Sequence, residues 1–351
     1  MDKMDPKYAP LFTPWKIGNV EIKNRIVLCP MGGTSLFGWM EPNHFDKEAA
    51  KFFLERAKNN VGLIIPGIAP LKDTIGGRWL WQNKKMFKDL KPFMEEIHET
   101  GAKLFVQLTA GMGRSWAITD HLVMLHNNPV LAAIAKPIID VRYQSASPSV
   151  LPSRWSDKVT CREITRKEIQ DIIDAYAKTA LLCKEAGVDG VEIHAVHEGY
   201  LLDQFTLKYT NKRTDEYGGS FENRYRFATD VVKAIKAVCG QDYPVSLRYS
   251  VLSKTKGFGD DCASSGSEHK SHRAENHQKR HNEVYCRKWG FARKIRNKVT
   301  INHAVYRGEN HHRNRWQGEF YQLFVCKVFR QLNVHSFSFP NGTLMIISDV
   351  S

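Results

Sequence analysis

The chain has 351 residues, of which 42% are hydrophobic, and a formal net charge of +14. Its longest apolar run, Leu63 to Pro70, is too short to cross a bilayer, and the N-terminal segment lacks the apolar core of a secretory signal. The seven cysteines are never spaced as CxxC, which indicates neither a disulfide framework nor a metal site. We therefore expect a soluble, cytoplasmic protein with reduced thiols.

The positive charge is distributed unevenly along the chain. Residues 1–256 contain 36 Lys and Arg against 29 Asp and Glu, and the last 95 residues contain 15 against 8, so each part has a surplus of 7. Eight of the 14 histidines also lie in the last part. We place the main boundary at Lys256 to Asp261 and predict two parts, residues 1–256 and residues 257–351.

Before this boundary, short apolar runs alternate with segments of helical periodicity, which indicates βα units around a parallel sheet. The segment from Thr109 to Glu163 is a connection long enough to suggest a functional loop. Thr165 and Glu168 form a capping box at the start of the clearest helix, and Gly187 ends it. The predicted strands span residues 25–30, 62–66, 103–108, 190–195 and 245–250, and the predicted helices span 45–58, 86–100, 166–186 and 221–238. Repeats of this kind without GxGxxG after the first strand favour a barrel over a dinucleotide-binding sheet.

The densest group of polar residues follows the strand at 190–195, in the string HAVHEGYLLDQF. In a βα barrel the C-terminal ends of the strands face the active site. His194 and His197 could direct two N–H donors at one anionic or carbonyl oxygen, and the Tyr200 phenol could supply a proton to a nearby carbanion. With Glu198, these residues form a candidate catalytic group. On spacing alone, two histidines near a strand end could equally be surface or capping residues.

This string, followed by NKRTDEYGGSFENRYRF at residues 211–227, resembles the Old Yellow Enzyme family. The resemblance is strongest to the bacterial branch of 2-enoate reductases and 2,4-dienoyl-CoA reductases. It extends through LFTPWKIGNVEIKNRIVLCPM at 11–31, QLTAGMGR at 107–114 and LRYS at 247–250, so it covers roughly residues 1–256. It implies an α/β fold, a (β/α)8 TIM barrel of the FMN-linked oxidoreductase type, incomplete here at about five βα units.

The resemblance also implies a reaction and roles for individual residues. Family members bind FMN and pass a hydride from NADH or NADPH through flavin N5 to an alkene conjugated to a carbonyl or thioester. The substrate expected here is a small-molecule enone, enoate or dienoyl thioester, with no membrane partner and an unknown oligomeric state. His194 and His197 match the pair that binds the substrate carbonyl, Tyr200 matches the proton donor, and Glu198 matches the carboxylate accompanying that tyrosine.

The flavin-binding positions are assigned in the same way. Pro30 and Met31 resemble residues whose backbone lies against the isoalloxazine, Gln107 the amide that binds the pyrimidine ring, and Arg248 the arginine near flavin N1 and O2. Gly32 stands where many relatives place a Thr or Cys that tunes the flavin, and Thr109 where many have a histidine. The string from Arg213 to Arg224 is expected to shape a loop and start a helix. No metal ligands are predicted.

After the boundary the alternating pattern ends, and nothing in residues 257–351 resembles the family's phosphate-binding loops. The change to a His-, Arg- and Asn-rich string is typical of a shifted reading frame. The other interpretation is a non-homologous basic tail, most of which is expected to be disordered. Cations mixed with aromatics, as in RKWGFARKIRNK at 287–298, keep open an alternative function as a nucleic-acid- or polyanion-binding protein. A five-stranded barrel would leave open sheet edges, which costs stability. Because the phosphate-binding loops are missing, we also expect loose flavin binding and poor activity.

Overall fold

The computed structural model describes residues 6–31, 33–38, 41–116, 119–196 and 199–249, together with four short strands of the remaining chain at 253–255, 259–261, 335–338 and 344–347. Gly32, His197 and Glu198 lie outside the described residues. So does the segment at 320–329, which the sequence indicates as the part of the tail apolar enough to pack. The predicted boundary between residues 1–256 and 257–351 stays a prediction.

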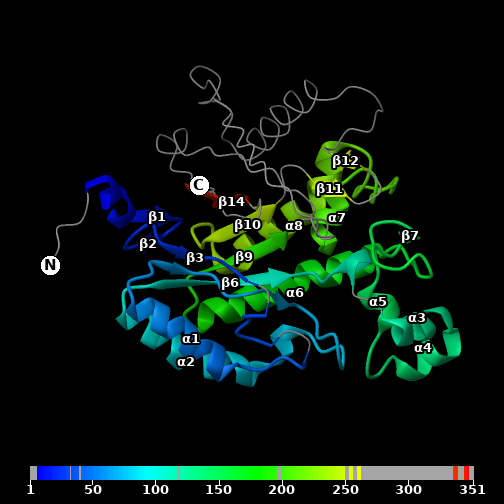
Figure 1. The fold of residues 1–351 in the computed structure, drawn as a ribbon, viewed down its shortest axis with the longest axis horizontal. Coiled ribbons are helices and arrows are strands. Elements are labelled where there is room, and N and C mark those ends of the chain that lie inside the picture. The colour runs from blue at the N-terminus through cyan, green and yellow to red at the C-terminus, as the bar shows by residue number, and fades with distance from the viewer. Residues whose placement is uncertain are drawn as a thin grey trace, which may run out of the picture.

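The centre of the fold is a curled sheet whose strands follow the order β13-β14-β10-β9-β6-β4-β3, with β5 also pairing with β6. The strands from β3 to β10 pair in parallel, as the alternating pattern predicted. In Figure 1 helices α1, α2 and α6 lie along one side of this sheet. The sheet strands are β3 (Val27–Leu28), β4 (Leu63–Ile64), β5 (Ala69–Pro70), β6 (Lys103–Thr109), β9 (Gly190–Ala195), β10 (Val245–Tyr249), β13 (His335–Ser338) and β14 (Leu344–Ile347).

The long helices follow these strands in the chain, close to the predicted positions. Thr165 begins α6 with the expected capping box, and Asp46 accepts hydrogen bonds from two backbone N–H groups at the start of α1. The main helices are α1 (Lys47–Lys58), α2 (Lys84–Glu99), α6 (Arg166–Glu185), α7 (Leu201–Thr206) and α8 (Phe221–Cys239). No helix in the part of the chain that the structure describes is long and apolar enough to span a membrane.

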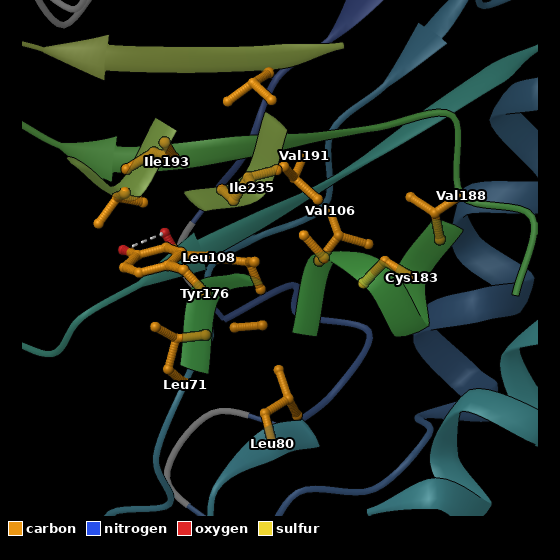
Figure 2. Close-up of a cluster of buried hydrophobic side chains, with 14 of the residues drawn as sticks. Leu71, Leu80, Val106, Leu108, Tyr176, Cys183, Val188, Val191, Ile193 and Ile235 are labelled. Carbon is orange, nitrogen blue, oxygen red and sulfur yellow. Dashed lines mark hydrogen bonds between the residues drawn. The ribbon is translucent and has the colours of Figure 1, made fainter. Parts of the chain in front are cut away.

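Alternation along the strands separates an apolar outer face from an inner face. Val106 and Leu108 of β6 and Val191 and Ile193 of β9 pack outward against the helices, with Tyr176 of α6 beside them (Figure 2). All five are 3% exposed or less. Burial of each large apolar side chain in this core stabilises the fold by on the order of 2 kcal/mol. The residues between them in sequence point into the barrel.

An antiparallel hairpin, β1 (Trp15–Ile17) and β2 (Val20–Ile22), closes the barrel interior at the N-terminal ends of the strands. Trp15, Ile17 and Ile22 form a second buried cluster with Phe105 of β6. A Cβ on Gly190 would lie 2.7 Å from the Phe105 ring, so this position of β9 accommodates only glycine while that ring fills the interior. Gln107 and Glu192, which follow Phe105 and Gly190 by two residues on the same strands, lie one layer further toward the C-terminal ends of the strands.

The edge of the sheet at β10 differs from the expectation. The sequence predicted an open edge at the fifth strand, and this was wrong, because β14 pairs with β10 in antiparallel register, Ser246 opposite Ile347. The pairing satisfies backbone groups along that edge without adding a βα unit. The fold thus remains an incomplete (β/α)8 barrel. Two further strands, β11 (Ser253–Thr255) and β12 (Gly259–Asp261), pair only with each other in the described chain.

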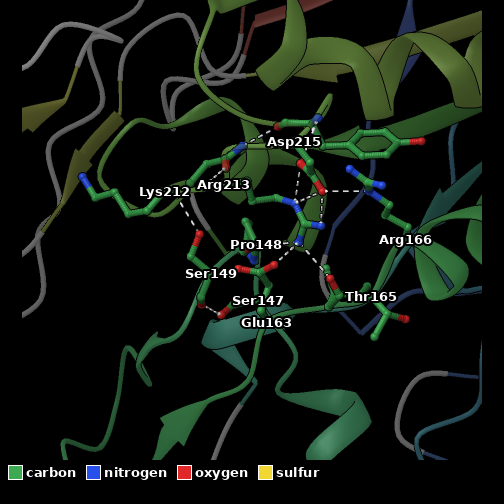
Figure 3. A network of polar contacts seen from close by, with 12 residues as sticks. Ser147, Pro148, Ser149, Glu163, Thr165, Arg166, Lys212, Arg213 and Asp215 are labelled. Atoms are coloured by element: carbon green, nitrogen blue, oxygen red, sulfur yellow. Dashed lines mark hydrogen bonds and ion pairs between the residues drawn. The ribbon is translucent and has the colours of Figure 1, made fainter.

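The long connection after β6 contains structure of its own. It includes η3 (Gly113–Ser115), α3 (Asp120–Asn127), α4 (Pro129–Ala135), α5 (Val141–Gln144), β7 (Leu151–Pro152) and β8 (Thr160–Cys161). Arg213, whose side chain is 3% exposed, donates to the carbonyl oxygens of Pro148 and Ile164 and binds Asp215 through two nitrogens (Figure 3). The string from Arg213 to Arg224 therefore joins this connection to the start of α8, as expected from its sequence.

This arginine network predicts an acid-dependent contribution to stability. The hydrogen bonds from Arg213 hold the pKa of Asp215 at about 2, below the ordinary value of an aspartate. Because the folded-state pKa is depressed, the contribution is complete above about pH 4 and is lost as the pH falls through 2. We expect Asp215→Asn to lower the free energy of unfolding by about 1 kcal/mol at pH 7, less than the full shift implies because solvent screens part of the pair. Urea unfolding at several pH values measures this difference.

The matched control is Asp171→Asn. Asp171 pairs with Lys167 at 3.0 Å, but its side chain is 43% exposed and that of Lys167 is 83% exposed. Its loss should change stability by about 0.5 kcal/mol or less at any pH. A difference between wild type and Asp215→Asn that is as large at pH 2 as at pH 7 would contradict the prediction.

Candidate active site

Three neighbouring strands place polar side chains in the barrel interior in two layers. The parallel register sets Gln107 of β6 and Ser246 of β10 opposite Glu192 of β9, and sets Arg248 opposite His194 one layer higher. We call Gln107, Glu192 and Ser246 the polar layer. Its three residues are 1%, 0% and 0% exposed. The upper layer lies at the C-terminal ends of the strands, where active sites of βα barrels are found.

Glu192 is the central residue of the polar layer. Gln107 Nε2 donates to one of its carboxyl oxygens at 2.6 Å, and Ser246 Oγ donates to the other at 2.9 Å. Burial raises the pKa of the Glu192 carboxyl, while Arg248 and these two hydrogen bonds oppose the rise. The sequence interpretation missed Glu192 and Ser246. A carboxylate within the otherwise apolar run GVEIHA was a signal that could have found the first of them.

The polar layer orients the side chain of Gln107. Because its Nε2 faces the carboxyl group, its Oε1 points elsewhere, and this buried oxygen has no hydrogen-bond partner among the described residues. A buried acceptor of this kind costs about 1–3 kcal/mol unless a donor meets it. The N3–H group of an isoalloxazine is such a donor. The unpaired acceptor at this position therefore fits a flavin ring.

The loop after β3 carries the next predicted flavin contacts. Pro30 is half-buried and Met31 is 47% exposed, so both are open to a ligand above the sheet. Met31 O accepts from Thr34 Oγ1 at 2.9 Å, and a Cβ on Gly67 would lie 2.4 Å from the same oxygen. This close approach fixes the loops after β3 and β4 together. Burial raises the pKa of the nearby Cys29 thiol, with Glu192 acting in the same direction and Arg248 against it.

His194 and Tyr200 come together as the sequence predicted. Their ring centroids are 4.1 Å apart in an edge-to-face contact. His194 is 3% exposed and Tyr200 is half-buried at the start of α7. Burial raises the pKa of Tyr200 to about 12, with Arg248 opposing the rise. The phenol is therefore protonated at neutral pH and can donate a proton. The positions of His197, Glu198 and Gly32 stay predictions.

A cavity opens beside Tyr200, over the loops that follow β5 and β6. We call it the aromatic cavity, because its walls include the rings of Trp79, Trp116, Tyr143 and Tyr200. Lys72 and Thr109 also line it. The sequence interpretation missed all of these except Tyr200 and Thr109. The residues come from separate loops, and no local pattern brings them together.

A half-barrel with a flavin-compatible acceptor and a phenol at the strand ends is typical of one class, the flavin-linked βα-barrel oxidoreductases. Residues 10–307 match the model of the NADH:flavin oxidoreductase / NADH oxidase family. The chain belongs to this family. The match runs past residue 256, beyond the part that the sequence resemblance covered.

Curated relatives support the same assignment. The chain is 44% identical over 262 residues to a cinnamate reductase of Clostridium sporogenes, a match covering 73% of this chain and 36% of that protein. It is 34% identical over 254 residues to an NADPH dehydrogenase of Bacillus velezensis, covering 70% of this chain and 64% of that one. The chain thus spans about a third of the length of the first relative and less than two thirds of the second.

Solved structures agree on the fold. The Old Yellow Enzyme from Pichia sp. AKU4542 superposes with a TM-score of 0.59 at 26% identity, covering 80% of this chain and 68% of that chain. A 2-naphthoyl-CoA reductase in complex with 2-naphthoyl-CoA gives a TM-score of 0.56 at 29% identity, covering 68% of this chain and 35% of that one. The incomplete TIM barrel is therefore that of the Old Yellow Enzyme type.

Proposed function

We propose that the protein is an FMN-dependent ene-reductase that uses NADH or NADPH to reduce an alkene conjugated to a carbonyl or thioester. The observation that carries the proposal is the buried Gln107 Oε1, which has no hydrogen-bond partner among the described residues. Glu192 fixes this amide by accepting from Gln107 Nε2, one layer below His194. FMN, when bound, supplies the redox chemistry that accepts a hydride from the nicotinamide and passes it on.

The residues of this chain would bind and orient the reactants. Gln107 would accept a hydrogen bond from the pyrimidine ring of the flavin, with the backbone of Pro30 and Met31 against the ring system. Arg248 would place a positive charge near the ring, where it favours an anionic reduced flavin. Gly32, the next residue in the chain after Met31, stays a predicted flavin-binding position.

Substrate activation and protonation fall to the upper layer. His194, together with His197, would bind the carbonyl oxygen and draw electron density from the alkene. Tyr200 would donate the proton to the carbon next to that carbonyl, and Glu198 would accompany it. The aromatic cavity and the cinnamate reductase relative favour a small aryl alkenoate as the substrate.

Flavin retention tests the proposal. The full-length chain, mixed with FMN and passed through gel filtration, should carry a visible flavin spectrum that its denatured form releases. A flavin-loaded preparation should oxidise NADH or NADPH when an enone is added, and the double variant His194→Ala, His197→Ala should lose this reaction while retaining the flavin. A folded preparation that holds no flavin would contradict the proposal.

A further inference from the structure

Lys72 is the charged side chain among the described residues that line the aromatic cavity. It follows β5 and is half-buried. Its Nζ lies 3.6 Å from the centroid of the Tyr143 ring and 5.1 Å from that of Trp79. Both distances are in the range of cation–π contact. The ammonium is thus held between two rings at the wall of the cavity that also contains Tyr200.

No carboxylate forms an ion pair with Lys72 in the part of the chain that the structure describes. Three carboxylates, Asp140, Glu168 and Asp171, act on it only from a distance. They are paired with Lys136, Arg162 and Lys167 respectively. Burial lowers the pKa of Lys72, and burial raises the pKa of the Tyr143 phenol, so the neighbouring ring stays neutral and supplies no counter-ion. A half-buried ammonium without a counter-ion gains most from an anionic ligand.

The rest of the lining limits the shape and charge of that ligand. Trp79, Trp116 and Tyr143 offer apolar ring surface, and no acidic side chain lines the cavity among the described residues. The polar groups besides Lys72 are neutral, such as Thr109 and Gln144, and Gln144 already donates to Asp73 O at 3.3 Å. The complementary molecule has an apolar, flat body and one negative charge.

We propose that Lys72 is a specificity-determining residue that binds the carboxylate of an aryl alkenoate and so selects the free acid over neutral enones and thioesters. This inference rests on the proposed function and names its substrate class. The pairing also has a chemical consequence. A carboxylate conjugated to an alkene makes the alkene a poor hydride acceptor, and a half-buried ammonium ion beside it offsets the negative charge.

Calorimetric titration of the full-length chain tests the inference without requiring turnover. The probes are trans-cinnamate and its neutral isostere trans-cinnamamide, titrated into wild type, Lys72→Met and Lys72→Arg. We expect wild type to bind cinnamate on the order of 10- to 100-fold more tightly than the amide, as a charge-assisted hydrogen bond provides. Lys72→Met should lose this preference, and Lys72→Arg should keep most of it.

The matched control is Lys178→Met. Lys178 Nζ lies 4.7 Å from the Trp81 ring, a similar cation–π contact, but its exposed side chain does not line the aromatic cavity. This variant should keep the wild-type preference. Equal binding of the two probes by wild type, or an unchanged preference in Lys72→Met, would overturn the inference.

The titrations also separate this inference from the proposed function. A chain that binds cinnamate through Lys72 but retains no FMN would leave the inference standing and refute the ene-reductase proposal. A chain that retains FMN and reduces a neutral enone, with cinnamate binding independent of Lys72, would do the reverse. Circular dichroism of each variant confirms that the comparison is made on folded protein.

Discussion

Replacing Tyr200 with phenylalanine should slow reduction of the alkene by about 10²- to 10⁴-fold, the usual contribution of a positioned general acid. The phenol is half-buried against His194, with ring centroids 4.1 Å apart, and its pKa is raised to about 12. It therefore remains protonated throughout the range in which the protein can be assayed. Removing the hydroxyl deletes the proposed proton donor while the ring continues to pack.

The effect should be confined to one half of the catalytic cycle. In rapid-mixing experiments, reduction of bound flavin by NADH or NADPH should proceed at the wild-type rate, because no proton from Tyr200 is needed there. Reoxidation by the alkene should carry the whole loss. Tyr217→Phe, a tyrosine packed between Phe205 and Phe227, provides the control and should leave both rates unchanged. Unchanged reoxidation in Tyr200→Phe would assign the proton to another group.

Replacing Glu192 with alanine should destabilise the fold and weaken flavin binding together. The change leaves Gln107 Nε2 and Ser246 Oγ without their acceptor inside a fully buried layer. Each unpaired group costs about 1–3 kcal/mol, so the free energy of unfolding should fall by about 2–6 kcal/mol. Against a total stability of about 5–15 kcal/mol, this is a large loss.

The flavin measurement distinguishes positioning from simple destabilisation. Freed from Glu192, the Gln107 amide can rotate, so the dissociation constant for FMN should rise on the order of tenfold or more even below the unfolding transition. Glu192→Gln is the conservative control, since its amide oxygen can still accept from Gln107 Nε2 and its amide nitrogen can donate to Ser246 Oγ. It should retain most of the stability and most of the flavin affinity. Equal flavin affinity in Glu192→Ala and wild type would contradict a positioning role.

The positions of the strands and helices were largely predictable from the sequence. Periodicity located the strand at 190–195 with the bounds that the structure has, and the Thr165–Glu168 capping box begins α6 as expected. These features depend on neighbouring residues in the chain, so a single sequence contains their causes. Strand lengths were less predictable. The strand expected at 25–30 reduces to Val27–Leu28, because the ladder extends only where a partner strand is in register.

The sequence by itself determined the alternation of strands and helices, the family resemblance, and the placement of His194 and Tyr200 at one strand end. Only the tertiary structure decided how the sites are completed. Glu192 meets Gln107 and Ser246 through the register of three strands, and β14 covers the edge of β10 that the sequence left open. The aromatic cavity arises from loops that are distant in the chain. Such contacts follow from packing and strand register, which act between segments far apart in sequence and therefore leave no local pattern.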